Sequence, residues 1–196
     1  MAQRILLCGM NGAGKSTLAR WLSEHADIRR MDVEDYYFEP RGDDPFGYQR
    51  PREEVCRLLE GDLRASERVV LAAVKADYGP GVVSLLTGAV HLIVPKAQRM
   101  ARVRARSQAR FGARMLPGGD LHRREEEFFR IVEAREEDAV RRWLESSGLP
   151  VLRLDGTRPV EENGRAVLAA MAHGDLQNRL EHANIEGNPG KGGFFA

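Results

Sequence analysis

One short segment constrains the fold of this chain more than any other. Close to the N-terminus the sequence reads Gly9-Met10-Asn11-Gly12-Ala13-Gly14-Lys15-Ser16, which matches the pattern G-x-x-x-x-G-K-[ST]. The apolar residues 4–8 precede it as a buried strand would, and an amphipathic helix is expected from Lys15 onward. A strand, loop and helix in this order direct backbone N–H groups and the start of the helix toward phosphate oxygens. The segment therefore predicts a phosphate-binding loop, or P-loop, for ATP or GTP.

The side chains of the P-loop have different expected roles. Lys15 is expected to reach the β- and γ-phosphates, and the Ser16 hydroxyl is expected to bind Mg²⁺. The expected cofactors are therefore ATP and Mg²⁺. A glycine-rich turn that only joins a strand to a helix would not require lysine and serine at these positions. The other residues expected to surround the phosphates are Gly9, Asn11, Gly12, Ala13, Gly14 and Thr17.

The rest of the chain alternates between short apolar runs and segments of helical period. The apolar runs cover residues 4–8, 28–33, 69–74, 90–94 and 151–154. Continuous apolar strands separated by helices predict an α/β fold with a parallel sheet and helices on both faces. A single domain is expected over residues 1–175, followed by a mobile tail over residues 176–196.

Two stretches interrupt this alternation. Residues 39–50 and 107–120 are rich in glycine, proline and charged residues, which is typical of loops or lids. The first belongs to an expected acceptor-side loop over residues 36–52, and the second to an expected lid over residues 102–120.

Two segments outside the P-loop carry charged groups in a suggestive pattern. Residues 31–38, Met-Asp-Val-Glu-Asp-Tyr-Tyr-Phe, follow a short strand, so their carboxylates should lie at the sheet edge beside the P-loop. Six arginines then fall between residues 99 and 114: Arg99, Arg102, Arg104, Arg106, Arg110 and Arg114. With the P-loop, these segments make residues 3–172 resemble the adenylate kinase, shikimate kinase and nucleoside kinase group of small-molecule P-loop kinases.

The resemblance implies a three-layer fold whose five parallel strands have the order 2-3-1-4-5. It also implies an acceptor site across the P-loop. The segment from Asp32 to Glu34 resembles the D-x-D segment of shikimate kinases, with Glu34 in place of the second aspartate. The wider segment also resembles the Asp-Asp-Phe-Tyr segment of uridine kinases. These resemblances imply that Asp32 or Glu34 orients or deprotonates the acceptor and that Asp32 helps to position Mg²⁺. Tyr36 is expected to contact the acceptor. The alternative is a solvated acidic turn beside packed aromatic residues.

The arginine segment resembles the entry to the lid of adenylate kinases. The resemblance implies that Arg102 covers the adenine and Arg106 reaches the transferring phosphate. Residues four apart share a helix face, so both guanidinium groups can point toward the nucleotide. Two alternatives are a solvated helix face and a basic stripe that contacts RNA.

Two further segments complete the expected site. Lys75 and Asp77 follow the strand at residues 69–74, where Lys75 could hold an anionic acceptor, although the Asp-Gly-Phe-Pro-Arg segment of adenylate kinases is absent here. Gly156 and Thr157 follow the last strand and resemble the turn that touches the adenine edge in related kinases. A turn or helix cap would explain them equally well.

The sequence as a whole predicts an ATP-dependent phosphotransferase for a small molecule, with a nucleoside or nucleoside monophosphate as the first choice. A P-loop NTPase that acts as a nucleotide-dependent switch or binds RNA is the alternative. The net charge of +1 does not favour a nucleic acid partner. No apolar run is long enough for a membrane span, so we expect a cytoplasmic monomer or homodimer.

Overall fold

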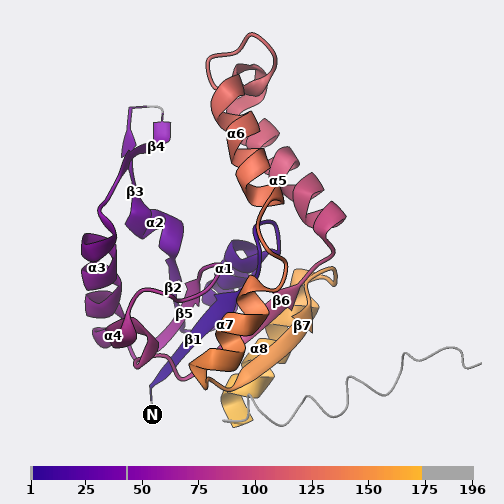
Figure 1. Cartoon of the computed structure of the whole chain (residues 1–196). Coiled ribbons are helices and arrows are strands. Elements are labelled where there is room, and N and C mark those ends of the chain that lie inside the picture. Colours follow the sequence, from indigo (N-terminus) through magenta and orange to yellow (C-terminus); the bar gives the residue numbers. More distant parts are fainter. Residues whose placement is uncertain (1, 43, 174–196) are drawn as a thin grey trace, which may run out of the picture.

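A parallel sheet forms the centre of the computed structural model, which describes residues 2–42 and 44–173 (Figure 1). Its strands have the order β2-β5-β1-β6-β7. When only the five strands of this sheet are numbered along the chain, their order is 2-3-1-4-5, so the fold expected from the sequence is confirmed. The expected C-terminal tail lies outside the described residues. The bounds of the five strands are β1 Gln3–Cys8, β2 Arg29–Asp32, β5 Arg68–Ala72, β6 Gly88–Ile93 and β7 Val151–Asp155.

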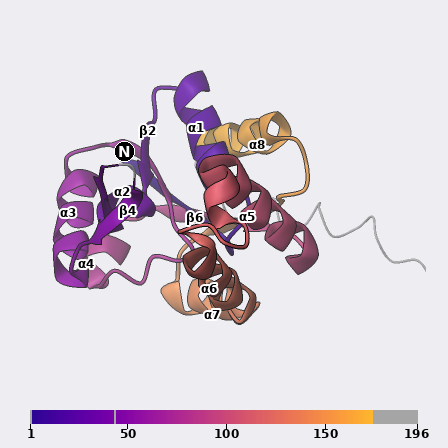
Figure 2. The same cartoon turned by 90° about the horizontal axis from the view of Figure 1, so that it is seen from above.

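Helices cover both faces of the sheet because its strands are apolar on both sides. On β1, Ile5 and Leu7 face one layer, and Leu6 and Cys8 face the other. The first layer contains α1 (Lys15–His25) and α8 (Val160–His173), which lie side by side in the view from above (Figure 2). The second contains α3 (Arg52–Arg64), α4 (Pro80–Val83) and α7 (Ala139–Ser147). Within the described residues, no helix is both long and apolar enough to cross a bilayer.

A β-hairpin projects above the carboxyl ends of the strands. After α2 (Val33–Tyr37), the chain forms β3 (Phe38–Arg41) and β4 (Asp44–Gln49), which pair antiparallel. The sequence predicted a loop here, and that prediction was wrong. The rings of Phe38 and Phe46 pack edge to face with centroids 5.0 Å apart, and Gly47 allows the two strands to approach closely because a Cβ there would lie 2.5 Å from Arg41 Cβ.

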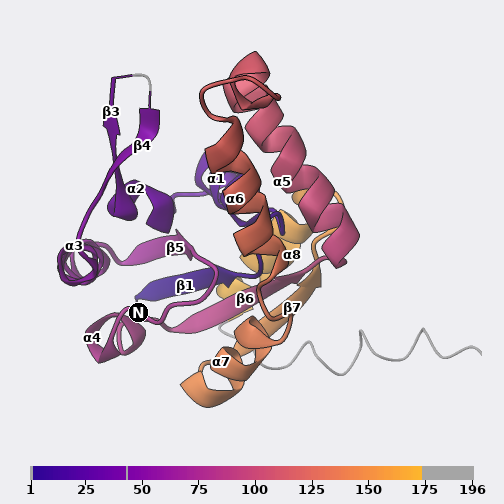
Figure 3. The same cartoon turned by 45° about the horizontal axis from the view of Figure 1, so that its top comes forward.

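A pair of helices, α5 (Lys96–Phe111) and α6 (His122–Glu133), faces the hairpin across the top of the sheet (Figure 3). The sequence placed a loop from residue 107, but α5 continues to Phe111. The helix continues because Val103, Ser107 and Phe111 lie on one buried face. Phe129 of α6 packs against Val103 and Phe111 in the same apolar cluster. The connection between the helices contains a short 3₁₀ helix, η1 (Gly112–Met115). We call α5, η1 and α6 the lid; it extends beyond the expected residues 102–120 at both ends.

Candidate active site

The P-loop connects β1 to α1 in a conformation that requires glycine. Gly12 has a φ of +81°, and a Cβ at this residue would lie 2.4 Å from the backbone oxygen of Arg99. The first turn of α5 therefore packs directly on the backbone of the P-loop. Gly14 is the N-cap of α1 and has no side-chain oxygen with which to cap the helix. The first N–H groups of α1 are consequently suited to an anion.

Lys15 is the first residue of α1 and is half-buried. Its Nζ donates a hydrogen bond to the Met10 carbonyl oxygen at 3.2 Å. Burial lowers the pKa of Lys15 to about 8, although the carboxylates of Asp32 and Glu34 favour its charged form. A phosphate beside this amine would act in the same direction as the two carboxylates and keep it protonated.

A cavity of about 540 Å³ extends from the P-loop toward the lid. It brings together side chains from three parts of the sequence, namely the P-loop, the end of β2 with α2, and α5. Nine residues that the sequence placed in the site line this cavity: Gly12, Gly14, Lys15, Ser16, Thr17, Asp32, Glu34, Arg102 and Arg106. The convergence of cationic, acidic and hydroxyl groups on one volume makes this cavity the candidate active site.

The acidic side of the cavity is positioned by the start of α2. Asp32 ends β2, is buried, and its Oδ1 accepts a hydrogen bond from the Glu34 backbone N–H at 3.2 Å. This N-cap interaction fixes the direction of the Asp32 carboxylate. It also holds Glu34 in the first turn of a helix whose N-terminus faces the same cavity.

The cavity fits Mg²⁺ held together with a nucleotide. Ser16 and Asp32 both line it, and Mg²⁺ commonly takes one or two protein oxygens and completes its coordination with phosphates and water. Within residues 2–42 and 44–173, no cluster of three or more His, Cys, Asp or Glu side chains could hold a metal ion.

The two lid arginines singled out from the sequence differ in their contacts. Arg102 Nη1 donates to the carbonyl oxygen of Gly156 at 3.0 Å and lies 3.5 Å from that of Gly12. Arg102 therefore joins the P-loop to the turn after β7. Arg106, one turn further along α5, lines the cavity and carries its charge close enough to Lys15 to oppose protonation of that amine.

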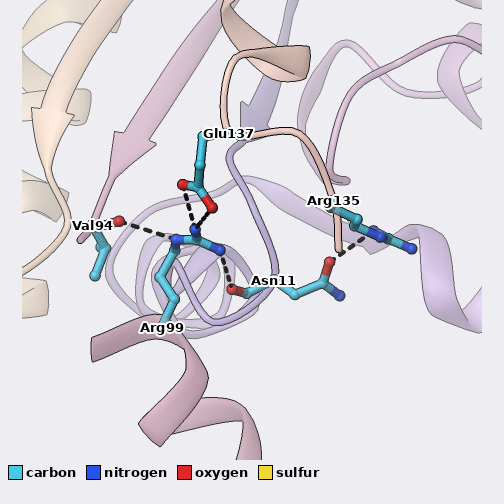
Figure 4. Close-up of polar contacts among 5 residues, drawn as sticks. All are labelled: Asn11, Val94, Arg99, Arg135 and Glu137. Carbon is cyan, nitrogen blue, oxygen red and sulfur yellow. Dashed lines mark hydrogen bonds and ion pairs between the residues drawn. The ribbon is translucent and has the colours of Figure 1, made fainter. Parts of the chain in front are cut away.

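A buried arginine that the sequence did not single out anchors the P-loop (Figure 4). The Arg99 side chain is 2% exposed, and its Nε donates to the Val94 carbonyl oxygen at 3.0 Å. Its Nη1 donates to the Asn11 carbonyl oxygen at 3.4 Å, and its Nη2 lies 2.5 Å from both carboxylate oxygens of Glu137. Arg135 adds a hydrogen bond of 2.7 Å to Asn11 Oδ1. The segment that follows the lid is thus tied to the P-loop. The sequence feature that could have identified Arg99 is its position four residues before Val103, which places it on the buried face of α5.

Other expected site residues lie away from the main cavity. The Tyr36 hydroxyl donates to Asp62 Oδ2 at 2.5 Å, so this ring faces α3. Burial and this hydrogen bond raise the pKa of Tyr36. Lys75 and Asp77 form an ion pair of 3.1 Å and line a separate cavity of about 450 Å³ that also contacts Met10.

The turn after β7 contacts Arg102 through the carbonyl oxygen of Gly156. Thr157 is folded back on Asp155, whose Oδ1 accepts hydrogen bonds from both its N–H and its hydroxyl, at 2.8 and 2.6 Å. Gly156 lines a cavity of about 270 Å³ together with Ala13 and Arg102. The structure therefore places Gly156 beside the P-loop and gives Thr157 the geometry of a turn residue.

Fold and site together define a P-loop protein built like the small-molecule kinases. A solved shikimate kinase from Acinetobacter baumannii in complex with shikimate aligns with a TM-score of 0.55 and 16% identity, over 90% of this chain and 97% of that one. A sugar kinase from Janibacter sp. HTCC2649 gives 0.53 and 17%, over 88% and 95%. A gluconokinase from Sinorhizobium meliloti 1021 gives 0.53 and 16%, over 88% and 93%. These likenesses establish the shared fold.

The sequence comparisons place the chain in a family. Residues 5–114, more than half of the chain, match the family described as AAA domain, and the chain belongs to that family. YqaC of Bacillus subtilis (strain 168), a protein described as uncharacterized, is 28% identical over 176 residues, which cover 86% of this chain and 97% of YqaC.

Proposed function

We propose that this protein is an ATP-dependent phosphotransferase whose acceptor is a small molecule, with a nucleoside or nucleoside monophosphate as the first choice. One observation carries the proposal: a single cavity joins the P-loop residues Lys15 and Ser16 to the carboxylates of Asp32 and Glu34 and to Arg106. The kinase fold of the structural relatives supports it.

In the proposed reaction the P-loop and Lys15 hold the β- and γ-phosphates of ATP, and the adenine lies toward Arg102 and Gly156. A hydroxyl or phosphate oxygen of the acceptor forms a bond to the γ-phosphorus, the bond from that phosphorus to the β–γ bridging oxygen breaks, and ADP leaves. Where the acceptor is a hydroxyl, Asp32 or Glu34 orients it and accepts its proton. When bound, Mg²⁺ neutralises charge on the β- and γ-phosphates.

Arg106 is the proposed stabiliser of the transferring phosphoryl group. It projects from the lid into the cavity, and a guanidinium remains charged and matches the geometry of phosphate oxygens. Closure of the lid excludes water, so the γ-phosphoryl is transferred to the acceptor and not lost to hydrolysis.

A screen with γ-labelled ATP and Mg²⁺ tests the proposal. Nucleosides, nucleoside monophosphates and small hydroxy acids would be offered one at a time, and labelled products separated by chromatography. We expect at least one labelled acceptor, and no label transfer with Lys15→Ala. If ATP is hydrolysed at the same rate with every compound and no acceptor is labelled, the protein is a nucleotide-dependent switch and the proposal is wrong.

A further inference from the structure

A further, smaller cavity lies between the hairpin and the lid. Four phenylalanines from four different elements line it: Phe38 of β3, Phe46 of β4, Phe111 of α5 and Phe128 of α6. Its lining is largely apolar, and its volume is about 200 Å³. We call this cavity the phenylalanine pocket.

We propose that the phenylalanine pocket binds a planar heteroaromatic ring of the acceptor, and that Glu125 recognises an amino group on the edge of that ring. This inference rests on the proposed function, because it names the class of acceptor for the same active site.

The walls of the pocket are suited to a flat ring. The Phe38 and Phe46 rings meet edge to face, at an interplanar angle of 81°, so they present two surfaces in different planes. Aromatic side chains interact with another ring by offset stacking or by edge-to-face contact. The guanidinium of Arg110 lies 5.2 Å from the Phe46 ring centroid and links the lid to the hairpin across the pocket.

The volume selects the size of the ligand. An engineered cavity of roughly 150 Å³ is sufficient to bind benzene, so about 200 Å³ has room for one ring or two small fused rings. The pocket therefore has the size of a single ring system, which matches the ring of a small acceptor.

A buried carboxylate gives the pocket chemical selectivity. Glu125 of α6 lines it, and this side chain is only 4% exposed. Arg124 Nε lies 3.5 Å from Glu125 Oε1. A carboxylate can accept about four hydrogen bonds, which leaves Glu125 able to accept from an N–H group of a ligand. A ring with an exocyclic amino group supplies such donors, whereas a ring without one leaves a buried carboxylate facing carbon.

The pocket continues into the phosphate cavity. Glu34, Arg106 and Arg110 line both volumes. A molecule with its ring among the phenylalanines therefore extends past Glu34 toward the phosphates on the P-loop. That is the direction in which an acceptor oxygen must point for transfer of the γ-phosphoryl group.

The test is calorimetry on the whole protein, with Mg²⁺ and a non-hydrolysable ATP analogue bound. The ligands are adenosine, cytidine and their deamino analogues, purine riboside and 2-pyrimidinone riboside. We expect at least one amino nucleoside to bind at least about tenfold more tightly than its deamino analogue. Glu125→Leu, which removes both acceptor oxygens, should remove most of this difference, and Phe46→Ala or Phe128→Ala should weaken binding about tenfold or more.

Matched controls separate the pocket from a general effect on the fold. Ile131→Ala and Tyr48→Ala remove exposed side chains from α6 and β4 that do not line the pocket, and both should leave nucleoside affinity unchanged. Circular dichroism reports whether each variant is folded, and the deamino analogues test the wild-type protein without any substitution. Lys75→Ala examines the alternative cavity beside Asp77 and should also have no effect.

The outcomes distinguish this inference from the proposed function. Phosphorylation of a ring-free hydroxy acid, with no nucleoside binding, would keep the kinase and reject the phenylalanine pocket as the acceptor site. Nucleoside binding that depends on Phe46 and Phe128, without any phosphoryl transfer, would keep the pocket and reject the kinase. Nucleoside affinity that falls with Lys75→Ala and not with the phenylalanine variants would also overturn the inference.

Discussion

Replacing Arg99 with alanine is expected to lower the free energy of unfolding and to weaken ATP binding in the same variant. The substitution empties a site that is 2% exposed and removes the donors to the carbonyl oxygens of Val94 and Asn11 and to the carboxylate of Glu137. Removing one partner of a buried ion pair costs about 3–5 kcal/mol. Glu137 is 50% exposed and can regain water, which places the expected loss near the lower end, at about 3 kcal/mol.

The effect on ATP follows from the position of Asn11 within the P-loop. Without Arg99, the Asn11 carbonyl loses its tie to α5, so the loop must be ordered by the nucleotide itself. We expect the dissociation constant of ATP to rise about tenfold, which corresponds to about 1.4 kcal/mol. Urea denaturation followed by circular dichroism measures the first quantity, and calorimetry measures the second.

The controls use the half-exposed partner of Arg99 and an arginine on the surface of α6. Glu137→Gln keeps the shape of the Arg99 partner but leaves the buried guanidinium without an anionic partner, so it should also cost about 3 kcal/mol. Arg130→Ala removes an arginine that is 70% exposed on α6 and should cost less than about 1 kcal/mol. If Arg99→Ala unfolds with a free energy within about 1 kcal/mol of the wild type and binds ATP normally, the anchoring role assigned to Arg99 is wrong.

Four further predictions concern individual residues. Lys15→Ala should leave the circular dichroism spectrum unchanged and abolish phosphotransfer; a rate above about a tenth of the wild type would contradict its role. Arg106→Ala should lower kcat by about 10³ in initial-rate assays and change ATP affinity far less; an equal loss in both would mean that it acts in the ground state. Asp32→Asn, which retains an oxygen able to cap α2, and Glu34→Gln should lower kcat by about 10² to 10⁴ without weakening ATP binding in calorimetry; near-normal turnover in both would remove this segment from the site. Burial, reinforced by the charge of Arg153, lowers the pKa of His91 to about 4, so the unfolded chain binds more protons than the folded one between about pH 6.5 and 4. Acid should therefore destabilise the wild type more than His91→Asn across this range, by on the order of 1 kcal/mol, and parallel curves of unfolding free energy against pH would contradict this.

The core of the fold could be predicted from the sequence because its signals are local. The P-loop combines glycines, Lys15 and Ser16 at fixed spacing, and the apolar runs mark strands that are buried on both faces. Each of these patterns is contained within a few neighbouring residues. The order of the strands came from the resemblance to P-loop kinases, and the structure has that order.

The hairpin and the full length of α5 were missed because long-range contacts outweigh local composition. Glycine and proline near residues 40–47 are typical of a loop, yet Phe38 and Phe46 lie on paired strands and pack against each other. Residues 107–111 remain helical because Phe111 packs with residues of α6 that lie almost twenty positions away in the chain.

In the candidate site, too, some residues could be predicted from local motifs and others depend on long-range contacts. Lys15, Asp32 and Arg106 could be proposed from motifs, since each lies in a recognisable segment. Arg99 looked like one arginine among six, and what distinguishes it is its contacts with Asn11 and Glu137, which are distant in sequence. The phenylalanine pocket depends on four elements meeting above the sheet, and no local pattern specifies such a meeting.

The central claim is that the γ-phosphoryl group of ATP passes to a small acceptor and not to water. Phosphorus NMR of the reaction with the best acceptor tests it most directly, because it follows ATP, ADP, inorganic phosphate and phosphorylated product in one sample. The account predicts that phosphorylated acceptor appears in step with ADP while inorganic phosphate stays a minor signal. Accumulation of inorganic phosphate in step with ADP, whichever acceptor is present, would contradict it.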